Sequence, residues 1–567
     1  MTAFATPQAA DPIWLKTYPA GLDWRAEIPV RPATDLLDET VRAYGDRPFL
    51  DFLGKKYRYR EIAGLVDRFA TGLQRIGLRK GDKVGLFLPN TPYYVIAYFG
   101  ILRAGGIVVN FNPLYADREV KHQIDDAQAK IMVTLDLDVV LGKLQRMLGQ
   151  TVLEKIIVCP MAHVLPFPKN LLFPLVKRKE LGSVPNDGRH LSFKDIIAND
   201  GKPAKVAIDP GEDVAVLQYT GGTTGLPKGA MLTHANIYAN TVQCTDWFPG
   251  ARLGEERMLG VLPFFHVFAM TAVMNLSIRL GAEIIMLPRF ELDTVMETIA
   301  GKKPTLFPAV PTIYTAILNH PKCAQYDLSS IRMCLSGGAP LPVETKNAFE
   351  KNTGCRLVEG YGLSEASPVT NCNPIDGVNK TGSIGLPLPG TSVEIVSLED
   401  GVTVLPPGER GELCVRGPQV MKGYWNKPEE TERTLRNGRL HTGDVAYMDE
   451  DGYVFIVDRI KDMILCSGYN VYPRNVEEAI LQHPSVAEVI VGGIPDEYRG
   501  QTVKAWVRLK EGAALTQNEL IAFLEDRLSK IEQPKFVEFR SELPKTLIGK
   551  LDRKALLQEE AAKSGKA

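Results

Sequence analysis

The segment Tyr219–Ala230, YTGGTTGLPKGA, is the part of the sequence from which fold and function are argued. Glycines allow backbone conformations in which consecutive N–H groups point toward one position, and threonine hydroxyls and a lysine ammonium add donors and positive charge. Such a position suits a polyphosphate. The apolar run Val214–Leu217 just before it predicts a buried strand, so the loop is expected at a sheet edge, where α/β folds bind ligands.

This loop differs from the common mononucleotide loop, G-x-x-x-x-G-K-[ST], because Lys228 is followed by Gly229. A flexible surface turn is the alternative interpretation of a single glycine-rich stretch. The combination of Thr-Thr-Gly with Pro-Lys-Gly is richer than a linker requires and favours the phosphate loop.

Length, charge and cysteine usage limit the class of protein. A chain of 567 residues exceeds what one core usually supports, so two or more domains are expected. The net charge of −1, with 66 basic and 67 acidic residues, predicts no attraction to nucleic acid. The eight cysteines are scattered and are expected as free thiols of a reducing compartment, and the N-terminus shows no secretion pattern, so a cytoplasmic location is predicted.

The first part of the chain predicts a layered α/β fold. Helices are expected at 61–76, 94–103 and 116–127, and strands at 84–88, 107–109, 131–135, 281–287 and 331–335. The most apolar stretch, Tyr93–Phe111, is interrupted by Arg103 and two glycines, and it is interpreted as a buried helix that leads into a strand rather than as a membrane span.

The later part of the chain changes character. Residues 390–457 contain short alternating strands separated by turns, which predicts a β-rich subdomain of a large domain 1–457. The charged run Asp458–Asp462 is the expected boundary, and beyond it residues 463–567 show a small α+β pattern, with helices at 475–482 and 517–529 and strands at 487–491 and 503–509. The roughly 105 residues after Asp462 are enough for a separate small domain.

Between Met161 and Arg189 the regular pattern stops. This segment combines apolar bulk with the cations Lys169, Lys177, Arg178 and Lys179, a composition typical of a surface that touches anionic lipid. The alternative is an inserted loop whose apolar residues pack on the body of the protein, and three prolines argue against one continuous amphipathic helix.

Four later clusters carry chemistry that fits a phosphate loop. Glu359–Glu365, EGYGLSE, offers an aromatic surface for a base, a hydroxyl for phosphate and a hard oxygen ligand for Mg²⁺. His441–Asp444, HTGD, places a carboxylate on a tight turn where ribose hydroxyls could donate to it. Asp458–Asp462 adds a basic residue, and Pro544–Lys554 places a lysine on a glycine turn. Taken singly, each has a plain interpretation as a turn or a solvated charge.

Taken together and in this order, the motifs resemble the adenylate-forming superfamily of acyl-CoA synthetases, peptide-synthetase adenylation domains and luciferases, over roughly residues 30–555. Within it the chain is most similar to bacterial long-chain fatty-acid–CoA ligases. The stretches that carry this resemblance are LQYTGGTTGLPKGAMLTHAN, EGYGLSE, GSIGLPLPG, GELCVRGPQVMKGYW, HTGD and VDRIKDMILCSGYNVYP.

The resemblance implies a two-step ligase in which a fatty acid attacks ATP to give an acyl-adenylate, and coenzyme A then displaces AMP. The implied phosphate ligands are Thr220, Gly221, Gly222, Thr223, Thr224, Gly225 and Lys228. Gly338, Ala339, Pro340 and Tyr361 would frame the adenine, and Glu359, Gly360 and Gly362 beside them are further cofactor-binding candidates. Ser364 would contact phosphate, Glu365 would hold Mg²⁺, Asp444 and Arg459 would bind the ribose, and Lys550 would contact the carboxylate and the α-phosphate. Family members often have threonine at the position of Ser364, and the hydroxyl is retained.

The resemblance also implies a rotation of the small domain about Lys461 between the two steps, which withdraws Lys550 and brings Gly468 to the passage for the thiol. His266 matches a wall position near the reacting carboxylate, although an isolated histidine is more often a core residue. Val267, Phe268, Met270 and Val273 are candidates for the acyl tunnel. Family members include homodimers, so a second copy of the chain is a candidate partner.

Other activities of the same chemistry stay open from sequence. An adenylating enzyme could load a carrier protein instead of coenzyme A, a medium-chain or aryl acid could be the substrate, and a luciferase-like oxygenase could oxidise the adenylate. The absence of a fused carrier domain and the insertion near residue 170 favour the long-chain CoA ligase.

Overall fold

The computed structural model describes residues 11–220, 227–467, 469–496, 498–546 and 550–563. The chain forms two compact units: unit 1 runs to Ser392 and includes Val415–Leu440, and unit 2 comprises Val393–Cys414 and the chain from His441 onward. The hinge expected at 458–462 lies within unit 2, so the domain boundary inferred from sequence stays a prediction. Within the described ranges, no helix has both the length and the apolar character needed to cross a membrane.

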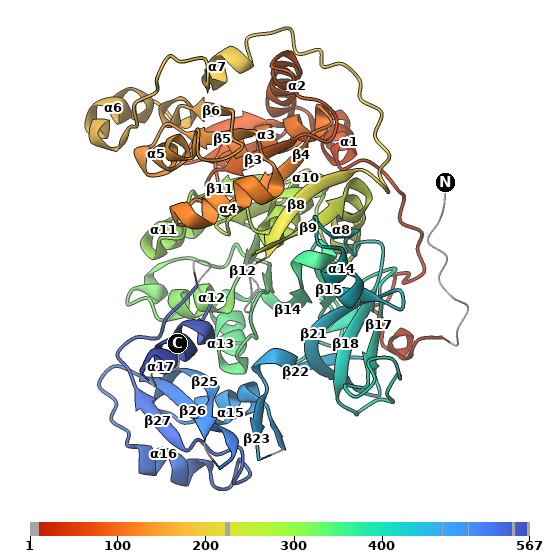
Figure 1. Ribbon diagram of the computed structural model, residues 1–567, viewed down its shortest axis with the longest axis vertical. Helices are drawn as coiled ribbons and strands as arrows, with labels where there is room; N and C mark the ends of the chain where they lie inside the picture. The colour runs from red at the N-terminus through yellow and green to blue at the C-terminus, as the bar shows by residue number, and fades with distance from the viewer. Residues whose placement is uncertain (1–10, 221–226, 468, 497, 547–549, 564–567) are drawn as a thin grey trace. The chain divides into compact units, whose positions relative to one another are not determined.

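An eight-stranded sheet forms one half of unit 1 (Figure 1). Its order is β19-β9-β8-β4-β3-β5-β6-β7; β4, β3, β5, β6 and β7 pair in parallel, β8 joins β4 in parallel, and β9 and β19 are antiparallel. The strands are β3 (Lys83–Phe87), β4 (Ile107–Asn110), β5 (Ile131–Leu135), β6 (Lys155–Cys159), β7 (His190–Ser192), β8 (Val214–Thr220), β9 (Lys228–Thr233) and β19 (Gly423–Tyr424).

Helices lie between these strands; the first three confirm the helices that the alternating pattern predicts, and the last three were not predicted. They are α2 (Tyr59–Arg75), α3 (Pro92–Arg103), α4 (Asp117–Ala127), α5 (Asp138–Met147), α6 (Lys169–Val176) and α7 (Phe193–Ile196). Proline at the first position of α3 fits because that residue's N–H has no helical partner. Residues 92–102 of α3 are all buried and the helix leads into β4, which confirms the buried helix predicted for the most apolar stretch.

A nine-stranded sheet forms the other half of unit 1, in the order β16-β15-β14-β13-β12-β10-β11-β1-β2. It is parallel from β1 to β14 along this order and antiparallel at its ends. The strands are β1 (Pro48–Phe52), β2 (Lys55–Arg58), β10 (Arg257–Gly260), β11 (Glu283–Met286), β12 (Leu306–Ala309), β13 (Met333–Ser336), β14 (Arg356–Gly362), β15 (Val369–Cys372) and β16 (Leu386–Pro387).

The helices of this half are α1 (Thr34–Tyr44), α8 (His234–Asp246), α9 (Val267–Ala269), α10 (Leu276–Leu280), α11 (Leu292–Lys302), α12 (Pro311–Leu318) and α13 (Val343–Thr353). Between α9 and α10 the helix widens into a π turn, η4 (Met270–Asn275). A further helix of unit 1, α14 (Pro428–Thr434), follows β19.

A five-stranded sheet has the order β17-β18-β21-β20, with β22 beside β21. Its strands are β17 (Ser392–Val396), β18 (Gly411–Arg416), β20 (Leu435–Arg436), β21 (Arg439–Met448) and β22 (Val454–Arg459). These strands confirm the predicted change to short β-structure after residue 390.

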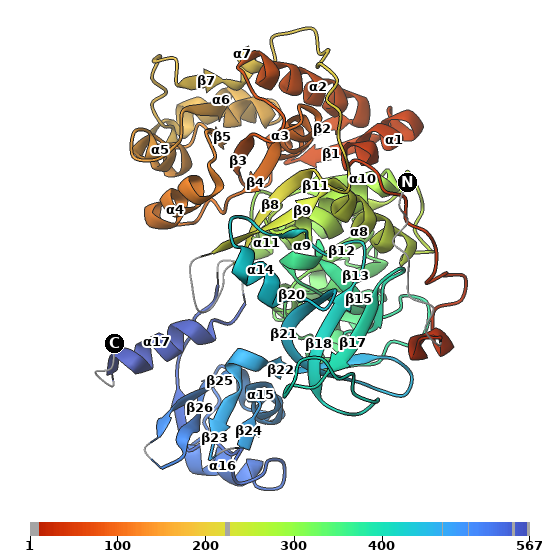
Figure 2. The same cartoon turned by 45° about the vertical axis from the view of Figure 1, so that its right-hand side comes forward.

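The last part of unit 2 is a small α+β fold (Figure 2). Its sheet has the order β24-β23-β26-β25, with β27 beside β26, and comprises β23 (Ile464–Cys466), β24 (Tyr469–Val471), β25 (Val486–Asp496), β26 (Gly500–Leu509) and β27 (Phe536–Phe539). α15 (Pro473–Leu481) and α16 (Gln517–Leu524) pack on a core that contains Val476 and Leu520, whereas α17 (Arg553–Lys563) packs on a second core around Trp506. The predicted helix 517–529 is too long, because the helix ends at Leu524 and the chain then turns.

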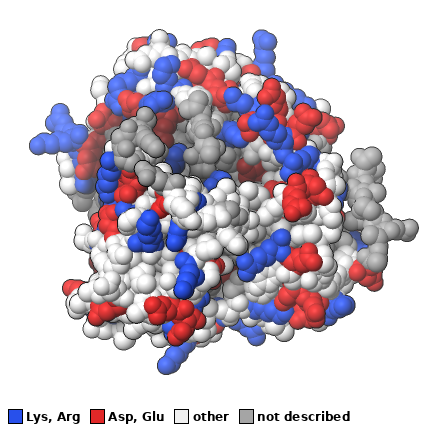
Figure 3. Space-filling model, turned by 60° about the horizontal axis from the view of Figure 1, so that its bottom comes forward, with Lys and Arg blue, Asp and Glu red and all other residues white. Residues whose placement is uncertain are grey.

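A smaller apolar cluster joins the predicted hinge to the strands before it. Val445, Val457 and Tyr472 are buried together, and Met463 and Ile460 pack against them. The one-turn 3-10 helix η7 (Ile460–Asp462) lies between β22 and β23. All eight cysteines are free thiols, as the sequence predicts. On the face shown in Figure 3, basic and acidic side chains are intermingled.

Candidate active site

The glycine-rich stretch connects two antiparallel strands. β8 ends at Thr220 and β9 begins at Lys228, and these two residues are paired across the hairpin. The predicted phosphate ligands Gly221, Gly222, Thr223, Thr224 and Gly225 lie outside the described residues. The strand predicted before the loop is confirmed, and a second strand follows it, so the sheet fixes both ends of the loop.

Lys228 and Glu365, two predicted site residues, are brought together through Tyr424. The Lys228 ammonium lies 5.1 Å from the centre of the Tyr424 ring, and the Tyr424 hydroxyl donates a 2.6 Å hydrogen bond to Oε1 of Glu365. Burial and the neighbouring Glu365 raise the pKa of Tyr424, so its hydroxyl stays protonated as a donor. The cluster therefore holds a cation near the Tyr424 ring and a carboxylate at its hydroxyl.

The same lysine forms an ion pair with a helix that sequence reasoning missed. Nζ of Lys228 lies 2.5 Å from Oε2 of Glu430 on α14, and this ammonium lowers the pKa of the Glu430 carboxyl. Tyr424 falls in the GELCVRGPQVMKGYW stretch, although no role was assigned to it, whereas Glu430 lies in no recognised motif. The Glu430 carboxylate is thus an internal anion paired with Lys228.

The predicted adenine frame lies on two adjacent parallel strands. β13 ends at Ser336, which pairs with Glu359 of β14, so the loop through Gly338, Ala339 and Pro340 leaves the sheet beside Glu359–Gly362. A Cβ added at Gly362 would lie 2.1 Å from the carbonyl oxygen of Pro368. Glycine is therefore required there by the close approach of another backbone segment.

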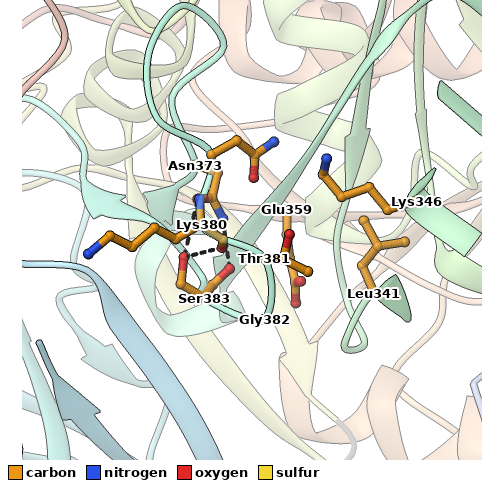
Figure 4. A pocket seen from close by; sticks show the side chains of 9 residues that line it. Leu341, Lys346, Glu359, Asn373, Lys380, Thr381, Gly382 and Ser383 are labelled. Carbon is orange, nitrogen blue, oxygen red and sulfur yellow. Dashed lines mark hydrogen bonds between the residues drawn. The ribbon is translucent and has the colours of Figure 1, made fainter. Parts of the chain in front are cut away.

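A small pocket lies beside this frame (Figure 4). Glu359 lines it together with Lys346, Lys380 and Asn373, and Asn373 Oδ1 accepts hydrogen bonds from the Lys380 N–H and the Ser383 hydroxyl, both at 3.1 Å. Leu341, the residue after Pro340, also lines the pocket. Of the predicted cofactor-binding residues in the described chain, Glu359 alone reaches it.

His266 and the candidate acyl-tunnel residues lie on one helical segment. His266 caps α9, with its Nδ1 accepting the Phe268 N–H at 3.3 Å, and Val267, Met270 and Val273 are buried. A Cβ added at Gly337 would lie 3.1 Å from the Phe268 ring, so this ring lies against the loop of the adenine frame. The candidate acyl wall and the adenine loop are thus neighbours in unit 1.

In unit 2, Asp444 lies within strand β21 (Arg439–Met448), so the tight turn predicted for His441–Asp444 is wrong, and hydrogen bonds hold this part of the strand. Glu412 accepts the N–H of Gly443 at 3.0 Å and contacts Nδ1 of His441 at 2.8 Å, while Thr442 donates to the Leu413 carbonyl at 2.7 Å. Gly443 has φ +73°, a conformation that other side chains rarely adopt. Glu412 is a further residue that sequence reasoning missed; it holds the backbone of β21 next to Asp444.

Lys550 lies near Asp444 and Arg459 in the same unit. Nε of Arg459 is 3.4 Å from Oδ1 of Asp444, across the paired strands β21 and β22. Burial and the like charge of Arg459 lower the pKa of Lys550 to about 8, against the attraction of Asp444. The structure therefore brings together the predicted ribose ligands and the predicted catalytic lysine.

The predicted site residues fall into two groups. Lys228, His266, the adenine frame, Ser364 and Glu365 belong to unit 1, and Asp444, Arg459, Lys461 and Lys550 belong to unit 2. Ser364 and Glu365 begin a short 3-10 helix, and Lys461 is exposed in η7. Gly468 lies outside the described residues. The ligand role of each residue stays a prediction.

Comparison with known proteins identifies the class. Residues 37–425 match the profile of the AMP-binding enzyme family, and residues 475–550 match that of the AMP-binding enzyme C-terminal domain. The chain therefore belongs to the AMP-binding enzyme family, with the large N-terminal α/β domain and smaller C-terminal domain that the sequence predicts.

Similarity to individual relatives extends over nearly the full chain. The chain is 49% identical over 558 residues to the long-chain-fatty-acid–CoA ligase of Bacillus subtilis (strain 168), which covers 96% of this chain and 98% of the relative. It is 40% identical over 564 residues to the Escherichia coli O6:H1 enzyme of the same name, covering 97% and 99%. ATP-bound MatB from Rhodopseudomonas palustris matches with a TM-score of 0.83 at 28% identity, covering 95% and 100%.

Proposed function

We propose that this protein is a long-chain-fatty-acid–CoA ligase that converts ATP, a fatty acid and coenzyme A into acyl-CoA, AMP and diphosphate. The observation that carries the proposal is the grouping of Lys550 with Asp444 and Arg459, in a chain 49% identical over almost its whole length to a long-chain-fatty-acid–CoA ligase. The activity that we propose, and the ATP, Mg²⁺ and coenzyme A that it requires, are those of the family to which the relatives belong.

In the first step, a carboxylate oxygen of the fatty acid forms a bond to the α-phosphorus of ATP, and the bond from this phosphorus to the bridging oxygen breaks to release diphosphate. Two anions approach each other, so offsetting negative charge dominates the barrier. We assign Lys550 to the carboxylate and α-phosphate, Lys228 and Thr220 with the following glycines to the departing phosphates, and Asp444 and Arg459 to the ribose.

Glu365 fits a magnesium ligand. Its carboxylate is partly exposed and Oε1 accepts the Tyr424 hydroxyl, so a hard oxygen donor stands in the cluster that holds Lys228. When bound, Mg²⁺ would add positive charge near the phosphates. The chain's own contribution is to hold this carboxylate in place through Tyr424.

In the second step, the sulfur of coenzyme A attacks the acyl carbonyl, AMP leaves with the bonding electron pair, and the thiol proton is released. We assign Gly468 to the thiol passage and Lys461 to the hinge about which the small domain turns. His266, with Val267, Phe268, Met270 and Val273, would line the acyl site.

The test is ATP-dependent AMP release with oleate, palmitate, octanoate, acetate and 4-coumarate, each with and without coenzyme A. Turnover with the long chains that requires coenzyme A is the expected result. Adenylate that accumulates without any gain from coenzyme A would overturn the thiol assignment and point to a carrier-protein acceptor, and preference for octanoate or 4-coumarate would overturn the chain-length assignment.

We also propose peripheral contact with an anionic membrane through the segment Phe167–Lys179. In the structure, Phe167, Leu171, Leu175 and Val176 are 79%, 62%, 75% and 74% exposed, so the packed-loop interpretation fails for these side chains. They lie on or beside α6, at the outside of unit 1 (Figure 1), with Lys169, Lys177, Arg178 and Lys179 alongside. Exposed apolar side chains next to cations match a bilayer surface of acidic phospholipids.

Sedimentation with vesicles of phosphatidylglycerol and phosphatidylcholine tests this contact. Replacing the four cations by glutamine should weaken binding to acidic vesicles, and added salt should weaken wild-type binding. Replacing four exposed lysines elsewhere (Lys322, Lys351, Lys510 and Lys530) by glutamine is the control of equal charge. Equal binding by both variants would contradict the assignment.

A homodimer is a separate proposal, which rests on the family resemblance. Light scattering of the purified chain should give the mass of two copies, and the mass of one copy at micromolar concentration would overturn it.

A further inference from the structure

Arg553 lies close to Lys550 in the sequence and contacts residues of the predicted hinge. It begins α17, three residues after Lys550, and its guanidinium contacts three carboxylates within unit 2. Nη1 lies 2.9 Å from Asp462 and 3.8 Å from Asp458, and Nη2 lies 2.9 Å from Glu477. The side chain is 19% exposed, so these contacts are largely shielded from solvent.

The four charges hold each other in a mostly buried site. Burial opposes the charge on Arg553, but Glu477, Asp458 and Asp462 outweigh this effect and raise its pKa. Burial raises the pKa of Asp458 and Glu477 despite the opposing attraction of Arg553. A buried ion network of this kind contributes little net stability, and breaking it is costly. Its main physical effect is therefore to fix geometry.

The three acids that contact Arg553 do not all lie on the same side of Lys461 in the sequence. Asp458 precedes Lys461 in the chain, whereas Asp462, Glu477 and Arg553 all follow it. A rotation about Lys461 therefore moves the last three together, and among these four charged groups it changes the contact between Arg553 and Asp458.

Asp458 also receives a second contact from beyond the hinge. Its Oδ2 accepts the N–H of Arg474 at 2.7 Å, and the Arg474 guanidinium donates to the carbonyl of Ile456 at 2.8 Å. Its Oδ1 accepts the N–H of Arg459 at 2.7 Å. The buried Asp458 carboxylate thus orients Arg459, a predicted ribose ligand. It also holds Arg474 and Arg553, which follow the predicted hinge in the chain.

We infer that Asp458 is a positioning residue that holds Lys550, through Arg553 and Arg474, in the arrangement used for adenylation, and that the second half-reaction requires these contacts to part. The inference rests on the proposed function. Arg553 lies three residues after Lys550, and the charges of Asp444 and Arg459 act on Lys550 while these contacts are made. Weakening the contacts should therefore shift the population away from the adenylating arrangement.

The test compares Asp458→Asn with Asp462→Asn. Both substitutions remove one carboxylate partner of Arg553, but only Asp458 lies before Lys461. The amide keeps the size of the side chain and one acceptor oxygen, and Glu477 stays paired with Arg553. Lys554→Gln, which removes an exposed cation next to Arg553, is the second control.

Adenylation is measured by pyrophosphate exchange, and thioester formation is measured with supplied acyl-adenylate and coenzyme A. In Asp458→Asn, adenylation should fall at least about tenfold while thioester formation stays within about twofold or rises. In Asp462→Asn and Lys554→Gln, the ratio of the two rates should stay within about twofold of wild type. An equal fall of both rates in Asp458→Asn, or equal ratios in the two asparagine variants, would overturn the inference.

Amide hydrogen exchange of the ligand-free proteins gives a readout independent of turnover. Exchange across residues 456–463 should rise in Asp458→Asn more than in Asp462→Asn. If Asp458→Asn does not fold, Arg474→Met, which removes the bond to Ile456, takes its place with the same expected split, and an unchanged ratio in that variant would overturn the inference. Failure of the proposed function is distinct, because wild type itself would then show no long-chain adenylation.

Discussion

We predict that the rate of adenylation falls as the pH rises through about 8 (the alkaline limb), because Lys550 then loses its proton. Burial and Arg459 lower the pKa of this lysine from its usual 10.5 to about 8, and the protonated form is the one that offsets the charge of carboxylate and phosphate. Raising the pH through 8 therefore removes the active form. At pH 9 only about a tenth of the free enzyme would be protonated, against nearly all of it for an ordinary lysine, so the rate should fall roughly tenfold.

The assay is pyrophosphate exchange with a long-chain fatty acid, without coenzyme A, because the thiol titrates in the same range. The limb should be seen in kcat/KM for ATP, which reports the free enzyme, and should move to higher pH in kcat because bound phosphate stabilises the ammonium. Activity after a brief exposure to pH 9.5, measured on return to pH 7.5, controls for denaturation.

Two variants test whether Lys550 causes the fall of the adenylation rate at high pH. Arg459→Gln removes the cation that lowers the pKa of Lys550, so the limb should move to higher pH, even though ATP binding weakens. Lys550→Ala should abolish adenylation and leave thioester formation from supplied acyl-adenylate. A wild-type profile that is level to pH 10, or a limb that stays in place in Arg459→Gln, would refute the reasoning.

Three other changes test the remaining parts of the site. Glu430→Gln removes the anion paired with Lys228, so the KM for ATP should fall severalfold; an unchanged or higher KM would mean that Glu430 positions the lysine productively. Gly362→Ala should reduce kcat/KM for ATP at least tenfold, because its Cβ would meet the Pro368 carbonyl at 2.1 Å; Gly301→Ala, with open space around it, is the matched control. Gly468→Trp should slow thioester formation but not adenylation, and normal overall turnover would contradict the passage.

Local patterns predicted much of the fold because each element carries its own signal. The strand at 131–135 is reproduced as β5, and α2 and α3 begin within two residues of the predicted helices. β9 was not predicted, since KGAMLT has no clear alternation and its pairing with β8 depends on contact across the hairpin. The long strands β25 and β26 extend beyond their apolar centres because they pair with each other along their length.

The site was predictable where one motif carries several ligands and unpredictable where distant residues meet. The order of the motifs led to Lys228, Glu365, Asp444 and Lys550. The partner of Lys228 lies 202 residues away, and no spacing rule of a single sequence connects a phosphate loop with a carboxylate on α14. Arg553 lies in the stretch Pro544–Lys554, but its role was not predictable because it depends on three acids from separate elements.

The apolar cluster around Val445, Val457 and Tyr472 has a consequence for temperature. The rotation proposed about Lys461 must part Met463 and Tyr472 from the two valines, so each catalytic cycle would expose and bury this small surface again. Apolar burial weakens on cooling. In the cold, the balance between the two arrangements should therefore shift away from the one used for adenylation.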